Sequence, residues 1–254
     1  MLTAVTGINW GDEGKGRVID MLAEKADIIV RYQGGNNAGH TVVSEQGKFV
    51  LNLLPSGILH PEAVCILGDG MVVDPEHLSR EIAQIREKGI EVTPKNLKIS
   101  KRATISMPWH RIQDELEESR LEKTGSAFGS TRRGIAYAYS DKYRKKTLRM
   151  GDLLHLNEEN THSRLKMMLE AKNLELAGCY HQEPMSYPAL LSWCEEQAVK
   201  FREYITDTGS LLEKALENGK NVLLEAQLGA MRDIDYGIFP YTSSSSTISA
   251  YGPI

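Results

Sequence analysis

The segment 7–16 constrains the fold of this chain most strongly. It reads Gly-Ile-Asn-Trp-Gly-Asp-Glu-Gly-Lys-Gly and directly follows the apolar run 2–5. A strand that enters a glycine-rich turn and then a helix forms a cradle for phosphate, because glycines let the backbone approach an anion and the first N–H groups of the helix point at it. Lys15 adds a mobile positive charge. The sequence therefore predicts a phosphate-binding loop at the start of an α/β fold.

This loop differs from the commonest P-loop in two ways. That P-loop reads Gly-x4-Gly-Lys-Ser/Thr, and here Gly16 stands where a hydroxyl would hold magnesium. The loop also carries Asp12 and Glu13. An acid beside bound phosphate repels it unless a metal lies between them or the acid acts on a second substrate. The plainer interpretation is an acidic N-cap on an ordinary helix.

A second glycine-rich loop follows another apolar run. Residues 31–41 read Arg-Tyr-Gln-Gly-Gly-Asn-Asn-Ala-Gly-His-Thr, after the strand-like run 28–30. Small residues around the single histidine, His40, indicate backbone held against a ligand with one titratable group aimed at it. A surface histidine in a glycine-rich loop is the alternative. Two such loops, each after a strand, fit a site at the carboxyl ends of a parallel sheet.

Further segments give the chain a resemblance to a known family. The chain reads Leu-Pro-Ser-Gly-Ile-Leu at 54–59, then Asp-Ile-Asp-Tyr-Gly at 233–237 and Pro-Tyr at 240–241. Together with 10–16 and 31–41, and in this order, these segments resemble the adenylosuccinate synthetase family. The resemblance covers the whole chain but only the front part of the family's length. We therefore expect the family's aspartate-binding loop and guanine-reading residues to lie outside these residues.

Alternating patterns along the chain predict the fold class. Apolar runs typical of strands lie at 2–8, 27–32, 48–53, 63–67, 96–100 and 221–225. Helical periodicity is clearest at 14–25, 75–89, 108–121, 160–177, 188–206 and 209–218. This alternation predicts an α/β protein with a mostly parallel central sheet and helices on both faces. The resemblance makes the sheet P-loop-NTPase-like, and we expect one domain over 1–254 with a mainly helical insertion across 105–205.

Composition excludes several classes of protein. The chain has 254 residues and is 41% hydrophobic, which allows a sizeable core. Its net charge of −4 gives no electrostatic reason to expect nucleic acid or an anionic membrane as a partner. No apolar run approaches the roughly 20 residues of a membrane helix, and no signal peptide precedes the first strand. The 3 cysteines are odd in number and far apart, so we expect reduced thiols in a cytoplasmic protein.

The resemblance implies the reaction. GTP-dependent ligation of IMP and L-aspartate would give adenylosuccinate, GDP and phosphate through a 6-phosphoryl-IMP intermediate, the first committed step of AMP synthesis. Asp12 would remove the N1 proton of IMP and bind Mg2+, the backbone carbonyl of Gly39 would be a second magnesium ligand, and His40 would donate a proton toward the oxygen between the β- and γ-phosphates. The expected GTP- and phosphate-binding residues are Gly11, Asp12, Glu13, Gly14, Lys15, Gly16, Arg17, Gly39, His40 and Thr41.

The IMP site implied by the resemblance draws on distant segments. Asn37 and Thr131 would hold the 5′-phosphate, and Ser243 falls where the family has a phosphate-binding threonine. Ser243 belongs to the run 242–247, which by composition is a linker or a binding loop; we favour a binding loop. Lys145 stands where an arginine crosses a homodimer interface to IMP. The expected IMP-binding residues are Asp12, Glu13, Gly14, Lys15, Asn37, Ala38, Gly39, His40, Thr131, Lys145, Gln227 and Ser243.

Two segments depart from the family's pattern. At 130–135 the chain reads Ser-Thr-Arg-Arg-Gly-Ile, and Arg132 replaces a glycine, which is tolerable only if the backbone there needs no positive φ. At 225–229 it reads Glu-Ala-Gln-Leu-Gly, so that Leu228 stands where the family's glutamine bonds N1 and O6 of the purine. A bulge in the strand would bring Gln227 into that place, and we expect Gln227 to contact the base.

Two alternatives to the ligase stay open. A chain that holds IMP and phosphate without turnover would be a nucleotide-binding module. The guanine and aspartate sites expected outside the chain favour this interpretation, whereas intact Asp12, Lys15 and His40 argue against it. A related ligase acting on another purine monophosphate would account for the changed segments 130–137 and 225–229, although Asp12 suits a 6-oxopurine with an N1 proton.

Overall fold

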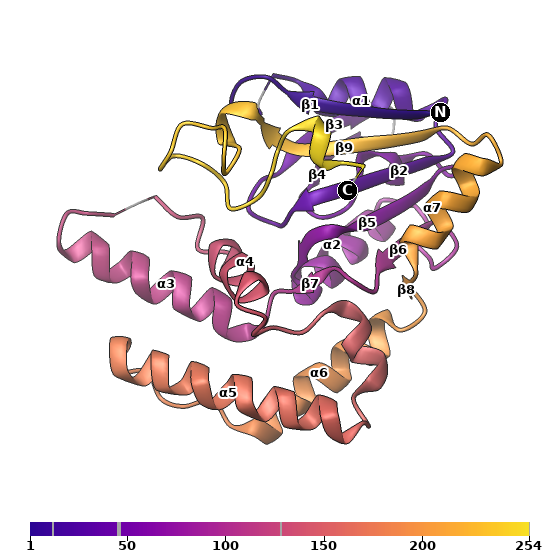
Figure 1. The fold of residues 1–254 in the computed structure, drawn as a ribbon. Coiled ribbons are helices and arrows are strands. Elements are labelled where there is room, and N and C mark those ends of the chain that lie inside the picture. The colour runs from indigo at the N-terminus through magenta and orange to yellow at the C-terminus, as the bar shows by residue number, and fades with distance from the viewer. Residues whose placement is uncertain (12, 45–46, 128, 254) are drawn as a thin grey trace.

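A parallel β-sheet forms the centre of the molecule in this computed structural model, which describes residues 1–11, 13–44, 47–127 and 129–253. The sheet has seven strands in the order β1-β9-β2-β5-β6-β8, with β7 beside β5, and its strand pairs run parallel (Figure 1). The strands are β1 (Leu2–Gly7), β2 (Ile28–Gly34), β5 (Val64–Val73), β6 (Leu97–Ser100), β7 (Thr104–Ile105), β8 (Ile205–Thr206) and β9 (Val222–Gly229). The predicted fold class is confirmed.

Helices cover both faces of this sheet, as the strand pattern predicts. In β2, Ile29 packs in a core cluster that includes residues of α1 and α2, whereas Ile28 and Val30 pack in a second cluster with α7. Successive side chains of a strand point to opposite faces, so buried residues on both parities require cover on both sides. The helices are α1 (Lys15–Ala23), α2 (Pro75–Glu87), α3 (Pro108–Lys123), α4 (Ile135–Tyr143), α5 (Glu159–Tyr180), α6 (Tyr187–Phe201) and α7 (Thr208–Glu217).

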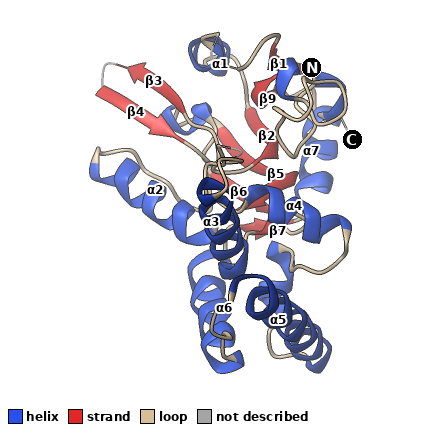
Figure 2. Ribbon diagram, turned by 90° about the vertical axis from the view of Figure 1, so that its left-hand side faces the viewer, coloured by secondary structure: helices blue, strands red, loops and turns tan. Residues whose placement is uncertain are grey.

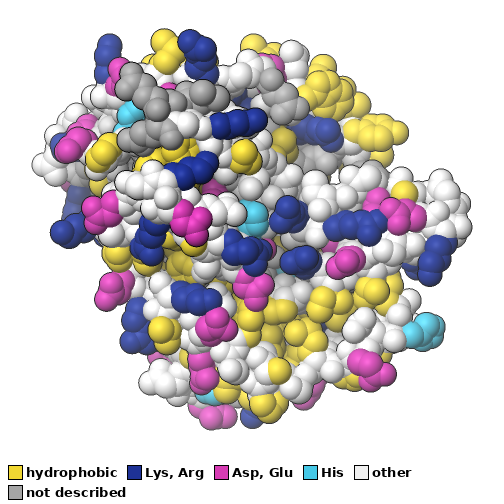
Figure 3. Space-filling model, turned by 180° about the vertical axis from the view of Figure 1, so that it is seen from behind, with side chains coloured by type: hydrophobic (Ala, Val, Ile, Leu, Met, Phe, Trp, Pro, Cys, Tyr) yellow, Lys and Arg dark blue, Asp and Glu magenta, His cyan; other side chains and the backbone are white. Residues whose placement is uncertain are grey.

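Four helices between β7 and β8 form a separate layer beyond the edge of the sheet (Figures 1 and 2). Seen from behind, this part of the surface carries a patch of hydrophobic side chains, and Lys, Arg, Asp and Glu are interspersed above it (Figure 3). Within the described ranges, no helix combines the length and apolar character needed to cross a bilayer.

A buried polar network joins these helices. The carboxylate of Asp141 lies 3.1 Å from Nε2 of His110 and 3.2 Å from Nζ of Lys172, and all three side chains are almost fully buried. Lys172 also reaches Glu175 at 2.9 Å. The backbone N–H of Met107 donates to Nδ1 of His110 at 3.0 Å, so the imidazole proton lies on Nε2 and points at Asp141. The network ties α3, α4 and α5 together through charge-assisted hydrogen bonds.

Two predicted elements differ from the structure, and one helix was not predicted. The strand expected at 48–53 pairs with none of the central strands: β4 (Gly47–Leu51) forms an antiparallel hairpin with β3 (His40–Ser44), which projects from the sheet (Figure 2). The helix expected at 188–206 ends at Phe201, because Ile205–Thr206 pairs with β6 as β8. Helix α4 was not predicted, since its short sequence lacks clear periodicity.

Candidate active site

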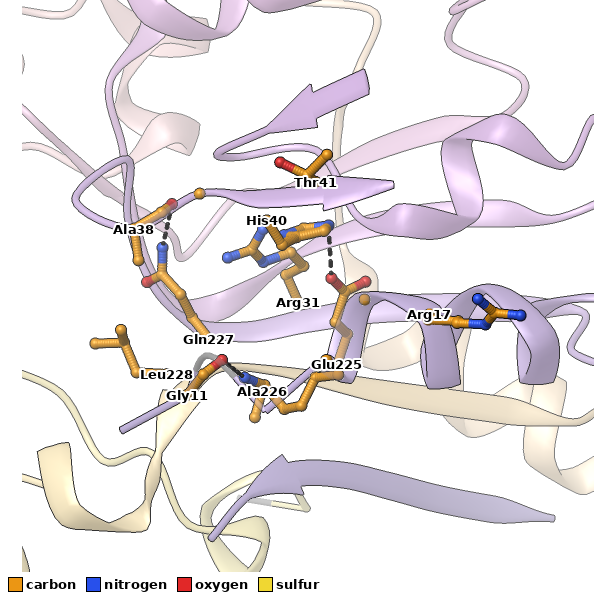
Figure 4. Close-up of a pocket in the computed structure, with 14 residues that line it drawn as sticks. Gly11, Arg17, Arg31, Ala38, His40, Thr41, Glu225, Ala226, Gln227 and Leu228 are labelled. Carbon is orange, nitrogen blue, oxygen red and sulfur yellow. Dashed lines mark hydrogen bonds and ion pairs between the residues drawn. The ribbon is translucent and has the colours of Figure 1, made fainter. Parts of the chain in front are cut away.

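The first candidate cavity lies at the carboxyl ends of three neighbouring strands, β1, β2 and β9. It has a volume of about 330 Å³ and is bordered by both glycine-rich loops (Figure 4). Parallel strands bring their following loops to one edge of the sheet, which is where ligands bind in such folds. The predicted site residues that line it are Gly11, Gly14, Lys15, Gly16, Arg17, Ala38, Gly39, His40, Thr41 and Gln227.

The first glycine-rich loop is held by a hydrogen bond within it and lies against the second loop. Gly14 precedes α1 with φ of +91°, a conformation that glycine adopts without strain. Lys15 Nζ donates to the carbonyl of Gly11 at 2.7 Å. A Cβ added to Gly16 would lie 3.4 Å from Cδ2 of His40, so the two loops lie in close contact. The start of α1 and the imidazole therefore border one space.

The imidazole of His40 is held by a serine and a glutamate that the sequence analysis did not assign to the site. Its Nε2 lies 2.8 Å from Oγ of Ser56 and 3.2 Å from Oε1 of Glu225. The Ser56 hydroxyl donates to the same glutamate at 3.1 Å, so Nε2 of His40 carries the imidazole proton. Burial lowers the pKa of His40 to about 4, with Arg31 and Lys15 adding to the effect and Glu225 opposing it. The imidazole is thus neutral near pH 7.

Two further buried side chains, Arg31 and Glu81, lie next to the His40–Ser56–Glu225 group. Arg31 is fully buried, and Glu225 and Glu81 oppose the lowering of its pKa that burial causes. The Glu81 carboxylate accepts the backbone N–H groups of Asn52 at 2.8 Å and Leu53 at 2.9 Å, which fixes the segment leading to the Ser56 turn. The segments 31–41, 54–59 and 225–229 were singled out as motifs, yet no pattern within them indicates that these side chains meet.

A second cavity, of about 480 Å³, is lined by polar and apolar residues from five stretches of the described chain, at 37, 114–121, 129–137, 228–232 and 241–244. It brings together Asn37, Thr131 and Ser243, three residues predicted to hold a 5′-phosphate. Oδ1 of Asn37 is buried and has no hydrogen-bond partner among the described residues. Arg232 also lines this cavity and supplies a cation that the sequence analysis missed. Hydroxyls, an amide and a guanidinium suit a phosphate monoester, whereas the carboxylates of Asp114, Glu117 and Glu118, which also line this cavity, do not.

The loop that carries Thr131 is shaped by one carboxylate. Asp114 of α3 accepts the hydroxyl of Ser130 at 2.6 Å and the backbone N–H of Gly134 at 2.8 Å. Between them, Arg132 has φ of +56°, so the condition stated for tolerating an arginine at this position is not met. A left-handed conformation costs a residue with a side chain about 1–2 kcal/mol. The Arg132 guanidinium makes an ion pair with Glu122 that offsets part of this strain.

Strand β9 bulges where the two cavities meet. Its pairing with β1 passes from Val5–Glu225 to Gly7–Gly229, so extra residues of β9 are accommodated opposite β1. Within the bulge Leu228 has φ of +65° and lines both cavities. The bulge foreseen from the sequence exists.

The side chain of Gln227 is bonded to the second glycine-rich loop. Its Oε1 accepts the N–H of Gly35 at 2.9 Å, and its Nε2 donates to the carbonyl of Gly35. The same Nε2 donates to the carbonyl of Ala38 at 3.1 Å (Figure 4). Both amide N–H groups are therefore bonded to the second loop, and Gln227 does not border the second cavity. The Gln227 amide therefore supports the second loop, and its contact with the base stays a prediction.

Gln227→Ala is expected to lower the free energy of unfolding by about 1–3 kcal/mol, because buried N–H and C=O groups of the loop lose their partners. Urea denaturation followed by circular dichroism measures the change. Gln84→Ala, at an exposed position in α2, is the control. A loss for Gln227→Ala no larger than that of the control would contradict the clamp.

The remaining predicted residues lie elsewhere. Lys145 lines a third cavity with Lys142, Arg149 and Arg164, separate from the two described above. Glu13 is exposed and accepts the backbone N–H of Asn9. Asp12 lies outside the described residues. Within the described ranges no group of three or more His, Cys, Asp or Glu side chains is placed to hold a metal ion.

A glycine-rich strand–loop–helix cradle at the carboxyl edge of a parallel sheet defines an α/β protein of the P-loop type. The family model described as adenylosuccinate synthetase matches residues 4–253, and the chain belongs to that family.

Curated proteins similar to this chain belong to the same family. Curated adenylosuccinate synthetases of Halothermothrix orenii and Carboxydothermus hydrogenoformans are 45% and 46% identical over 95% and 96% of this chain. The matches cover 55% and 56% of those relatives, so the chain spans just over half their length.

Solved structures extend the comparison. Fully ligated adenylosuccinate synthetase from Plasmodium falciparum has a TM-score of 0.84 and 36% identity over 98% of this chain and 56% of its own. A cyanophage S-2L succinoaminodeoxyadenylate synthetase, bound to dGMP and dATP, has a TM-score of 0.62 at 20% identity, covering 98% of this chain and 57% of its own. The second likeness is one of fold.

Proposed function

We propose that this chain carries the IMP site and the phosphoryl-transfer site of a GTP-dependent ligase that joins IMP and L-aspartate into adenylosuccinate. The products would include GDP and phosphate, and 6-phosphoryl-IMP would be the intermediate. The observation that carries the proposal is the meeting of two cavities at Leu228, one with a phosphate cradle and the other with phosphate-binding side chains. Membership of the adenylosuccinate synthetase family supports it.

The two cavities have different roles in this proposal. The second holds the 5′-phosphate of IMP on Asn37, Thr131 and Ser243, so that the purine extends toward the junction. The first holds the transferred phosphate of GTP against Lys15 and the N–H groups at the start of α1, which lower the energy of the charge that develops on its oxygens. Asp12, the proposed base for the N1 proton, lies outside the described residues.

His40 can act as the proposed acid only after a movement of its side chain. Its single proton lies on Nε2 and points at Ser56 and Glu225. Donation to a phosphate oxygen in the first cavity requires the imidazole to turn away from Glu225. We propose that charge on the bound phosphate draws this proton. Before that, burial and the charges of Arg31 and Lys15 keep the ring neutral, and Ser56 and Glu225 hold its one proton on Nε2.

Magnesium is the implied metal. Gly39 lines the first cavity and its carbonyl oxygen is the kind of ligand that Mg2+ prefers, and Asp12 would add a carboxylate. When bound beside phosphate, Mg2+ would neutralise phosphate charge. The ligands fit this ion in chemical type.

A nucleotide-binding module without turnover is the second candidate, since both cavities could hold phosphate without a reaction following. We further propose a cytoplasmic homodimer in which Lys145, at the third cavity, reaches the partner's IMP. The experiment that separates ligase from module is an absorbance assay for adenylosuccinate with IMP, GTP, Mg2+ and L-aspartate. Product that requires all four supports the ligase; binding of IMP with no product leaves the module.

A further inference from the structure

Among the described residues, Leu228 alone lines both cavities. Its side chain lines both the phosphate-cradle cavity and the hydroxyl-lined cavity, and it is half-buried at their junction. A Cβ on Gly11 would lie 2.4 Å from Cα of Leu228, so the first loop packs directly against this residue. The junction is therefore walled by an aliphatic side chain.

The position of the purine between the cavities follows from the chemistry of the proposed function, on which this inference rests. The 5′-phosphate lies in the second cavity, and the atom on carbon 6 must reach the phosphate held in the first. Carbon 6 and its substituent therefore lie at the junction, beside Leu228. We propose that Leu228 determines specificity: the 6-substituent packs against an apolar side chain and receives no side-chain hydrogen bond from this strand.

The side chain of Gln227 does not supply that hydrogen bond in place of Leu228. The nearest amide in sequence, Gln227, has both N–H groups bonded to loop carbonyls at Gly35 and Ala38. A Cβ on Gly34 would lie 1.6 Å from Oε1 of Gln227, which shows how closely the amide is enclosed by that loop. Turning Gln227 toward the base would leave buried backbone groups unpaired.

The inferred substrate class is a purine nucleoside 5′-monophosphate that carries an N1 proton and either oxygen or sulfur on carbon 6. Sulfur is larger than oxygen and accepts hydrogen bonds weakly. A site that reads the 6-position with an amide N–H would reject it, whereas a leucine wall provides only dispersion contacts, which sulfur satisfies well. Because 6-thio-IMP keeps the N1 proton, the comparison isolates the edge that faces Leu228.

The test is isothermal titration of IMP and 6-thioinosine 5′-monophosphate into the wild type, Leu228→Asn and Leu228→Gly. Asparagine adds an amide and glycine adds none, and both suit the positive φ at this position, so the variants should fold. Thermal melts check this. We expect the two ligands to bind the wild type and Leu228→Gly with affinities within about threefold, and Leu228→Asn to favour IMP by about tenfold, the value of one hydrogen bond.

Other results would overturn the inference. A wild-type preference for IMP of about tenfold or more that Leu228→Gly leaves unchanged would show that another group reads the 6-position. A preference in the wild type that disappears in Leu228→Gly would mean that the leucine itself rejects sulfur. If neither monophosphate binds a folded wild-type chain, the proposed function fails first.

Discussion

Replacing Asp141 by alanine is expected to lower the free energy of unfolding by about 3–5 kcal/mol, because removing one partner of a buried charge network leaves the others uncompensated. The side chain of Asp141 is 2% exposed and that of Lys172 is 6% exposed, so water cannot replace the lost carboxylate. The three helices that the network joins, α3, α4 and α5, would lose the carboxylate that bridges them. Urea denaturation monitored by circular dichroism measures the effect.

A surface ion pair supplies the control for this experiment. Glu196 and Lys200 of α6 lie 2.6 Å apart and are well exposed, so Glu196→Ala should change stability by no more than about 1 kcal/mol. If Asp141→Ala lowered the free energy of unfolding by no more than Glu196→Ala does, the buried network would not stabilise the fold as expected.

The pH dependence gives a second check. Burial raises the pKa of Asp141, but the hydrogen bond from His110 and the charge on Lys172 outweigh burial and hold it below its usual value. Its contribution is therefore present above the unfolded pKa of about 3.9 and is lost as pH falls through the lower folded value. The difference between wild type and Asp141→Ala should shrink in that acidic range.

His40→Ala is expected to reduce the rate of adenylosuccinate formation by about 10²–10⁴-fold, the usual loss when a proton-donating side chain is removed. The loss should appear in kcat, because Lys15 and the N–H groups of the first loop still hold phosphate. Steady-state rates at saturating IMP, GTP, Mg2+ and L-aspartate measure it.

His60 is the matched control. Its Nε2 lies 2.9 Å from Asp20 and it borders neither cavity, so His60→Ala should retain the wild-type rate. If His40→Ala kept kcat and changed only the KM for GTP, His40 would be a binding residue and the acid role would be wrong.

The positions of most strands were predictable because burial on both faces leaves continuous apolar runs. Those of most helices were predictable from their periodicity. The upper half of β5 was not, because Gly68 and Gly70 resemble a turn. A Cβ on Gly70 would lie 2.2 Å from the carbonyl oxygen of Tyr32, and one on Gly68 would lie 2.9 Å from that of Arg31. These glycines permit close approach to β2 within the sheet, a tertiary requirement that local patterns do not carry.

The sequence predicted which residues of the family's motifs belong to the candidate site. It did not predict the side-chain contacts that depend on tertiary packing. The family resemblance grouped Asn37, Thr131 and Ser243 at one site, and the second cavity brings them together. The destination of Gln227 depends on how a bulge turns consecutive side chains, and spacing cannot show this. The contact of His40 with Glu225 joins residues far apart in sequence, so no local pattern indicates it.

Titration of IMP and of GTP into Thr131→Val and Lys15→Met tests directly whether the two cavities are halves of one site. Thr131→Val should weaken the binding of IMP by about tenfold and leave the affinity for GTP within about threefold of wild type, because one hydroxyl of the second cavity is lost. Lys15→Met should weaken GTP and leave IMP nearly unchanged. Equal weakening of both ligands by each variant, or no change in either, would contradict the assignment of one phosphate to each cavity.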